Sequence, residues 1–172
     1  MRMLTSFGIL FAIAASVAAS DDKTDRATLR GIKEVCVIVE LTGPTQVGVP
    51  VSKDRLQTEI EGRVTASGLS INKEATACLF LHVQPLPALG RNKLPALGRN
   101  NKPVGLYALE LSLQLMQTVS LTRDPSVKTY APTWSVANMA TLPAEDVDPA
   151  ARQITVDLVD RFVQAYQSVN PK

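Results

Sequence analysis

Most catalytic chemistry in this chain would have to depend on His82, because it is the only histidine among 172 residues. A serine or cysteine nucleophile would need this imidazole as its base, and no Gly-x-Ser-x-Gly elbow accompanies it. One imidazole cannot build a histidine-rich zinc site, and no cysteine pair or acidic loop has metal-ligand spacing. The sequence therefore predicts no catalytic residue, metal or cofactor, with His82 as a partly buried sheet residue.

Carboxylates are the other groups that could carry acid and base chemistry. Glu59 stands between Arg55 and Arg63 at the i, i+4 spacing of helix ion pairs, and Asp157 and Arg161 repeat that spacing. The sequence also has no glycine-rich dinucleotide or phosphate loop. We therefore predict that the protein is not an enzyme.

Cys36 and Cys78 are the only thiols. A disulfide between them would constrain the unfolded chain by roughly 4 kcal/mol. Each cysteine also stands in an apolar, strand-like run, where a free cysteine behaves as a small hydrophobic residue. Both alternatives are open at this stage.

Residues 1–20 have the pattern of a secretory signal peptide. Arg2 supplies the positive start, an apolar run follows, and Ala18 and Ala19 form a small-residue cleavage site. The alternative is an uncleaved anchor helix, which needs roughly twenty apolar residues. Cleavage would give a secreted or periplasmic protein without a membrane span, and no cysteine near the site could carry a lipid.

The mature chain has the size of a single domain. Its polar beginning predicts a flexible arm at residues 21–33, ahead of one domain at residues 34–170. The whole chain carries a formal net charge of only +2, so its composition does not favour nucleic acid as a partner.

Hydrophobic periodicity predicts an α+β fold. Residues 35–41 are apolar at both odd and even positions, as expected for a central strand that is covered on both faces. Leu56, Ile60 and Val64 follow at the spacing of one face of an α-helix. Residues 106–121 alternate apolar and polar side chains, and residues 127–139 are expected to return beside them as a hairpin. Pro132 predicts that this second strand is an edge strand or is bulged.

The chain ends in a predicted helix that begins at Asp148 as N-cap, with Pro149 in the first position. These elements predict a two-layer sandwich: a mostly antiparallel sheet with a βαβ start, a long hairpin, and two helices packed on one face.

A loop insertion at residues 84–103 separates two of the predicted strands. In this insertion, the sequence of residues 86–92 is repeated identically at residues 94–100. Two copies are too few for a solenoid. A tolerated duplication is the plainer interpretation, since doubling a loop costs only about 0.6 kcal/mol. The alternative is a cationic arm in which Arg91 and Arg99 contact an anionic envelope component.

Trp134 is the only tryptophan. On a strand it is either a core anchor or, with Tyr130 on the same side, part of a binding face.

The order of leader, buried strand, capped helix, long hairpin and closing helix resembles small periplasmic α/β proteins of bacterial envelopes. It is similar to the TolB amino-terminal domain and the lipopolysaccharide-assembly lipoprotein. The resemblance covers residues 34–170, carries no residue-specific motif, and implies an accessory or binding role.

We therefore expect a non-catalytic protein that binds an envelope component through the strand edge near Pro132 or the uncovered sheet face. The alternative is a small secreted hydrolase or ligand-binding protein with a pocket near His82.

Overall fold

A computed structural model describes residues 21–43, 51–87, 96–97 and 103–171, so the predicted signal peptide lies outside the described residues. The elements, in chain order, are α1 (Lys23–Ala27), β1 (Glu34–Leu41), α2 (Lys53–Ala66), β2 (Ser70–Ile71), β3 (Ala77–Pro87), β4 (Ala96–Leu97), β5 (Pro103–Val104), β6 (Leu106–Leu121), β7 (Asp124–Pro143), the 3-10 helix η1 (Ala144–Asp146) and α3 (Val147–Val169).

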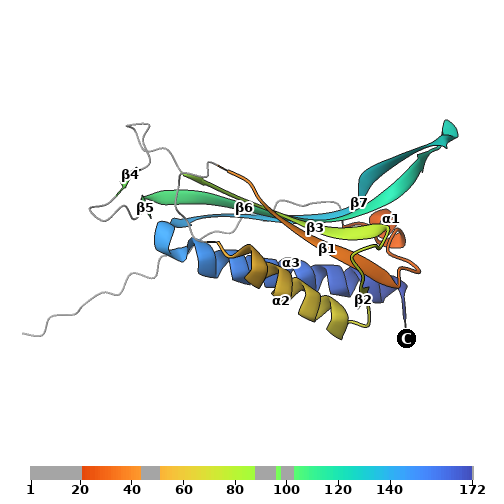
Figure 1. Cartoon of the computed structure of the whole chain (residues 1–172), viewed down its shortest axis with the longest axis horizontal. Coiled ribbons are helices and arrows are strands. Elements are labelled where there is room, and N and C mark those ends of the chain that lie inside the picture. The colour runs from red at the N-terminus through yellow and green to blue at the C-terminus, as the bar shows by residue number, and fades with distance from the viewer. Residues whose placement is uncertain (1–20, 44–50, 88–95, 98–102, 172) are drawn as a thin grey trace, which may run out of the picture.

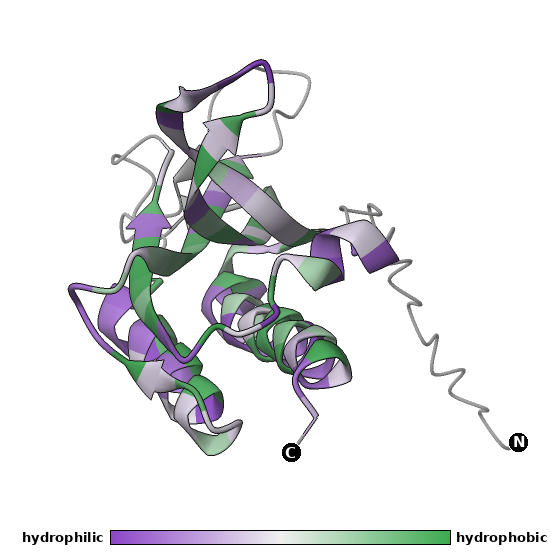
Figure 2. Cartoon of the chain, turned by 90° about the vertical axis from the view of Figure 1, so that its right-hand side faces the viewer, coloured by the Kyte–Doolittle hydropathy of each residue, from purple (hydrophilic) through white to green (hydrophobic). Residues whose placement is uncertain are grey.

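Five of the strands form one sheet in the order β2-β1-β3-β6-β7. β1 is parallel to β2 and β3, whereas the β3–β6 and β6–β7 pairs are antiparallel. α2 and α3 lie side by side on one face of the sheet (Figures 1 and 2). The predicted two-layer α+β fold is confirmed.

The core fills the space between the helices and the sheet. β6 contributes a row of fully buried leucines, at positions 109, 111, 113 and 115, while the residues between them are partly exposed on the other face. This is the period of two expected for a strand covered on one side. α2 meets the sheet with Leu56, Ile60 and Val64, as its stripe predicted.

α2 also has the ends that the sequence indicated. Ser52 is its N-cap residue, although its side chain makes no capping hydrogen bond. Gly68 follows the C-cap Ser67 with φ +100°, a conformation that residues with a Cβ rarely adopt. The chain can therefore turn at once into β2 beside β1.

β7 is an edge strand, as Pro132 predicted. Leu115 pairs with Trp134 and Met116 with Pro132, so Thr133 is left out of the ladder as a bulge. Beyond Gln117 no described strand flanks β6 on its other side, because β3 begins at Ala77, the partner of Gln117. The rest of the hairpin therefore has two free edges and bends away from the helices (Figure 1).

The last helix begins earlier than expected. Asp146, rather than Asp148, is the N-cap of α3, and Pro149 lies inside its first turn. The difference arises because η1 leads directly into the helix, so the backbone is already helical before the first capping signal in the sequence.

Residues 21–33 are not the flexible arm that their polar composition suggested. Asp22 caps α1 by accepting from the amides of Thr24 and Asp25, and Leu29 is fully buried in the core. Leu29 and Ile32, which packs against the core as well, are too few in a polar segment to give a periodic signal, so the sequence did not reveal these contacts.

The insertion is only partly described. β3 continues to Pro87, beyond the end expected near Val83, and β4 pairs with β5 in a ladder of their own. Arg91, Arg99 and most of the repeat lie outside the described residues. The role of that loop stays a prediction.

Candidate functional site

Trp134 is a core residue, which was the first of its two interpretations. Its side chain is 1% exposed and packs edge-on against Phe162, with 5.3 Å between the ring centroids. Its indole Nε1 donates to Asp21 Oδ1 at 2.9 Å, so the buried N–H has a partner. Trp134 therefore cannot be the surface anchor that we considered.

Asp21 links this buried indole to the surface. Its two oxygens accept from Nε and Nη2 of Arg26 at 2.8 and 2.7 Å. The hydrogen bond from Arg26, followed by that from Trp134, lowers the pKa of the Asp21 carboxyl despite the opposing effect of burial. The carboxylate form is thus favoured beside the core.

Tyr130 lies on the projecting hairpin with 49% of its surface exposed. It shares no face with Trp134, because the bulge at Thr133 changes the alternation between the two residues. Sequence spacing alone placed them on one side. The structure keeps Tyr130 as a surface candidate and removes Trp134.

His82 belongs to the sheet face that the helices leave uncovered. Its Nδ1 lies 3.2 Å from Glu40 Oε2, and its Nε2 lies 2.9 Å from Thr42 Oγ1. A carboxylate only accepts, so Nδ1 donates to Glu40 and, in the neutral ring, Nε2 accepts from the threonine hydroxyl. Hydroxyl, imidazole and carboxylate therefore form one hydrogen-bonded chain.

Sequence reasoning missed Glu40 and Thr42 as neighbours of His82. The available signal was Glu40, the one charged side chain in the apolar run of β1. Its meaning depended on the parallel register of β1 and β3, in which Glu40 is the partner of His82. That register could not be read from the sequence.

The two cysteines are bonded. Cys36 and Cys78 are direct partners across β1 and β3, with their α-carbons 4.4 Å apart, and they form a disulfide. Both are nearly buried and cluster with Ala75, apart from the main core. The disulfide alternative is confirmed, and such a bond persists in oxidising compartments outside the cytoplasm.

The uncovered sheet face is less polar than predicted. Ile38 and Met139 are 41% and 42% exposed, and Phe80 and Met116 are partly exposed on the same side. Glu110, Ser112 and Gln114 of β6 supply polar positions among them. The face is mixed, with apolar groups open to contact.

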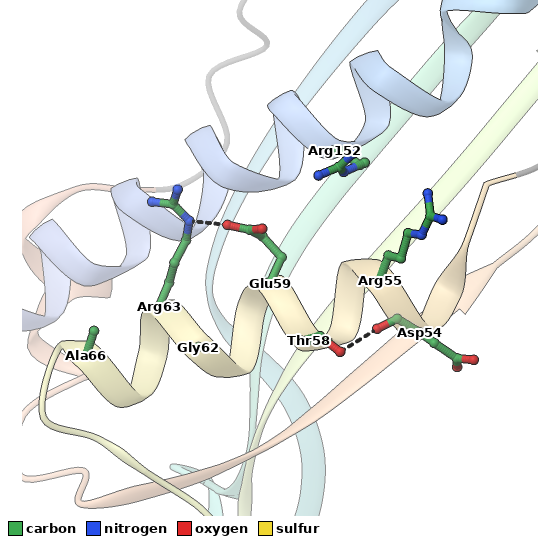
Figure 3. A pocket seen from close by; sticks show the side chains of 8 residues that line it. All are labelled: Asp54, Arg55, Thr58, Glu59, Gly62, Arg63, Ala66 and Arg152. Carbon is green, nitrogen blue, oxygen red and sulfur yellow. Dashed lines mark hydrogen bonds and ion pairs between the residues drawn. The ribbon is translucent and has the colours of Figure 1, made fainter.

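Two clefts lined by described residues lie on the helix side of the molecule. One runs between α2 and α3 and is lined by Asp54, Arg55, Thr58, Glu59, Gly62, Arg63, Ala66 and Arg152 (Figure 3). The other adjoins the end of α3, near Gly68 and Asn170. Neither contains His82, so neither is the pocket that the hydrolase alternative requires.

The part of the chain that the structure describes offers neither a metal centre nor a membrane-spanning helix. No group of three or more His, Cys, Asp or Glu side chains there is arranged to hold a metal ion. No helix among them is long and apolar enough to cross a membrane.

The fold thus defines a small α+β protein with one covered and one uncovered sheet face. No family model and no curated protein sequence matches the chain. Solved structures do resemble it. PelC from Paraburkholderia phytofirmans, a variant described as a dodecamer, has a TM-score of 0.46 and 13% identity over 90% of this chain and 99% of that one.

Two lipoproteins are also similar in structure. A minor lipoprotein from Acinetobacter baumannii has a TM-score of 0.39 and 16% identity, covering 82% of this chain and 95% of its own. Rare lipoprotein B from Shewanella oneidensis has a TM-score of 0.38 and 11% identity, covering 78% and 96%. These similarities concern the fold alone, because at most 16% of the aligned residues are identical.

Proposed function

We propose that this protein is an exported, non-catalytic accessory protein that binds another component of the cell envelope through the outer edge of β7, with Tyr130 as a contact residue. The observation that carries the proposal is that β7, a strand of 20 residues, ends the sheet, and no described strand pairs with its outer edge.

A free edge presents unpaired N–H and C=O groups, which an extended segment of a partner can bind as an additional strand. Pro132 and the bulge at Thr133 interrupt this edge. Between this bulge and a second register shift at Ser120/Leu121, residues 128–131 pair regularly with β6, and the strand from Asp124 to Tyr130 is exposed along its whole length. We therefore place the contact on the hairpin.

Two further features support the envelope setting. Residues 1–20 have the pattern of a signal peptide, which would direct the chain out of the cytoplasm. The Cys36–Cys78 disulfide suits an oxidising compartment. Neither feature identifies the partner, so the test must be specific for the hairpin.

Site-specific photocrosslinking in the native envelope provides that test. A photoreactive residue replaces Tyr130 in one variant and Val127 in a second, both of which are exposed on the hairpin. The matched control carries the probe at Gln164, which is exposed on α3. We expect one adduct of the same mass from both hairpin positions and none from the control. Identical adducts from all three positions, or none from any, would refute the proposal.

One observation supports a second candidate function, that of a small hydrolase. The hydrogen-bonded order Thr42, His82, Glu40 matches that of a nucleophile, a general base and the group that orients the base. In such a reaction Thr42 Oγ1 would attack an ester carbonyl while its proton passes to His82 Nε2. The proton would then go to the leaving alcohol, and water would hydrolyse the acyl group.

A fluorophosphonate probe tests this candidate, because it labels activated hydroxyl nucleophiles covalently. The hydrolase function requires labelling of the parent protein at Thr42 and its loss in Thr42→Ala and His82→Ala. An unlabelled parent protein excludes this function.

A further inference from the structure

We propose that the cleft between α2 and α3 binds a phosphate group between Arg55 and Arg152. Arg55 is on the first turn of α2, Arg152 is near the start of α3, and both line the cleft (Figure 3). Neither guanidinium forms an ion pair with a described residue. Three arginine–carboxylate ion pairs do occur among the described residues, and they involve Arg26 and Arg63. Two unpaired guanidinium groups in one cleft are suited to bidentate recognition of phosphate oxygens.

The carboxylates near the cleft are already engaged or point elsewhere. Glu59 and Asp160 both accept from Arg63, at 2.8 and 2.6 Å, so this third arginine is fully engaged. Asp148 Oδ1 accepts from the Ser52 amide, at 3.4 Å. Figure 3 shows the carboxylate of Asp54 pointing away from α3. Arg55 and Arg152 are therefore the two guanidinium groups of the cleft that no described carboxylate contacts.

The helix dipoles also favour an anion at this end of the cleft. A hydrogen bond from the Ser52 amide to Asp148 connects the start of α2 with the start of α3. A second hydrogen bond, from Arg63 to Asp160, connects the last turn of α2 with the middle of α3. The two helices are therefore parallel, and both positive N-terminal ends lie at the end of the cleft where Arg55 and Arg152 are found.

The floor of the cleft leaves room for the molecule that carries the phosphate. Thr58, Gly62 and Ala66 follow one another at helical spacing along α2 and have small side chains. A Cβ added at Gly62 would meet no atom within 4 Å. The cleft therefore has two unpaired guanidinium groups at one end and a shallow, largely apolar floor, which fits a phosphate attached to a larger body as well as a free phosphate ion.

The test uses the mature, disulfide-bonded protein and inorganic phosphate, exchanged against chloride at constant ionic strength. Binding is followed by the NMR shifts of the arginine Nε–H groups. We expect a saturable shift at Arg55 and Arg152 and a loss of affinity of about tenfold or more in Arg55→Gln/Arg152→Gln. Arg30→Gln/Arg123→Gln is the control, since it removes the same charge at two exposed positions outside the cleft.

A linear shift without saturation, or equal weakening in both double variants, would overturn the proposal, because it would show general charge screening. A saturable shift that only the cleft variant loses supports it. Far-UV circular dichroism of every variant verifies that the fold is retained.

The source of the phosphate is distinguished with vesicles. Flotation with phosphatidylglycerol vesicles, and not with phosphatidylcholine, would identify a lipid headgroup; phosphate binding without flotation would identify a soluble phosphate compound. Gly62→Leu provides a variant of unchanged charge, because its side chain would occupy the floor while the helix is retained. We expect it to retain inorganic phosphate binding and to lose vesicle binding. Retained flotation would refute the role assigned to the floor.

Discussion

Breaking the Cys36–Cys78 disulfide should destabilise the protein by about 4 kcal/mol, because the bond closes a loop of 42 residues in the unfolded chain. Native proteins of this size are stable by only about 5–15 kcal/mol, so the loss is a large fraction of the total. For a chain of this length it corresponds to a decrease in the melting temperature of roughly 8–16 °C.

The native structure should change little when the bond is absent. β1 and β3 are paired in register from Cys36 to Leu41 and from Cys78 to Val83, and β3 is paired along its other side with β6. The cysteines also belong to a small cluster apart from the main core, so shortening them leaves only a small cavity. The loss therefore arises mainly in the unfolded state.

Urea unfolding followed by tryptophan fluorescence measures this loss directly. Trp134 is the only tryptophan and is 1% exposed, so its emission reports on exposure of the core. The oxidised protein is compared with the reduced protein and with Cys36→Ala/Cys78→Ala, whose transition must not respond to reductant. Overlapping transitions of the oxidised and reduced proteins would refute the reasoning, since they would show that the crosslink does not restrict the unfolded chain.

Two further predictions concern the hydrogen bonds of Asp21 to the core, and the two glycines within and just after α2. Folding lowers the pKa of the Asp21 carboxyl. Its contribution to the free energy of unfolding is therefore fully present above the unfolded-state pKa of 3.8 and is lost as the pH falls through the lower folded-state pKa. Asp21→Asn should reduce the free energy of unfolding by roughly 1 kcal/mol at neutral pH and flatten its acid dependence, measured by urea titrations at several pH values; an unchanged profile would contradict this. Gly68→Ala should destabilise by about 1–2 kcal/mol because of its positive φ, whereas Gly62→Ala, in the middle of the helix, should stabilise by about 0.5–1 kcal/mol; thermal melts that shift in the same direction would refute the distinction.

Periodicity was enough to predict the layers of the fold. The alternation along β6 and the stripe on α2 follow directly from burial on one face, and Pro132 marked β7 as an edge strand because proline cannot donate to a ladder. Each of these features depends only on residues close together in the sequence, so a single sequence is enough to predict it.

The features that sequence reasoning missed depend on contacts between distant segments. The bulge at Thr133 reverses the side chains between Tyr130 and Trp134, so a count of alternating positions placed both on one face. The parallel register that joins Glu40 to His82 and Cys36 to Cys78 is likewise set by tertiary packing. Composition also misled at residues 21–33, where a buried leucine, the Asp21 carboxylate and hydrogen bonds from α3 hold a polar segment to the core.

The hydrogen bond between Asp21 and Trp134 has a practical consequence for work with this protein. Cleavage at the small-residue site predicted around Ala18 and Ala19 would leave Asp21 close to the new amino terminus. The start of the mature chain would then be part of its structural support. An affinity tag or an imprecise truncation there would disturb the packing around the indole, so a recombinant form should be authentic at its amino terminus and should carry any added sequence after Lys172.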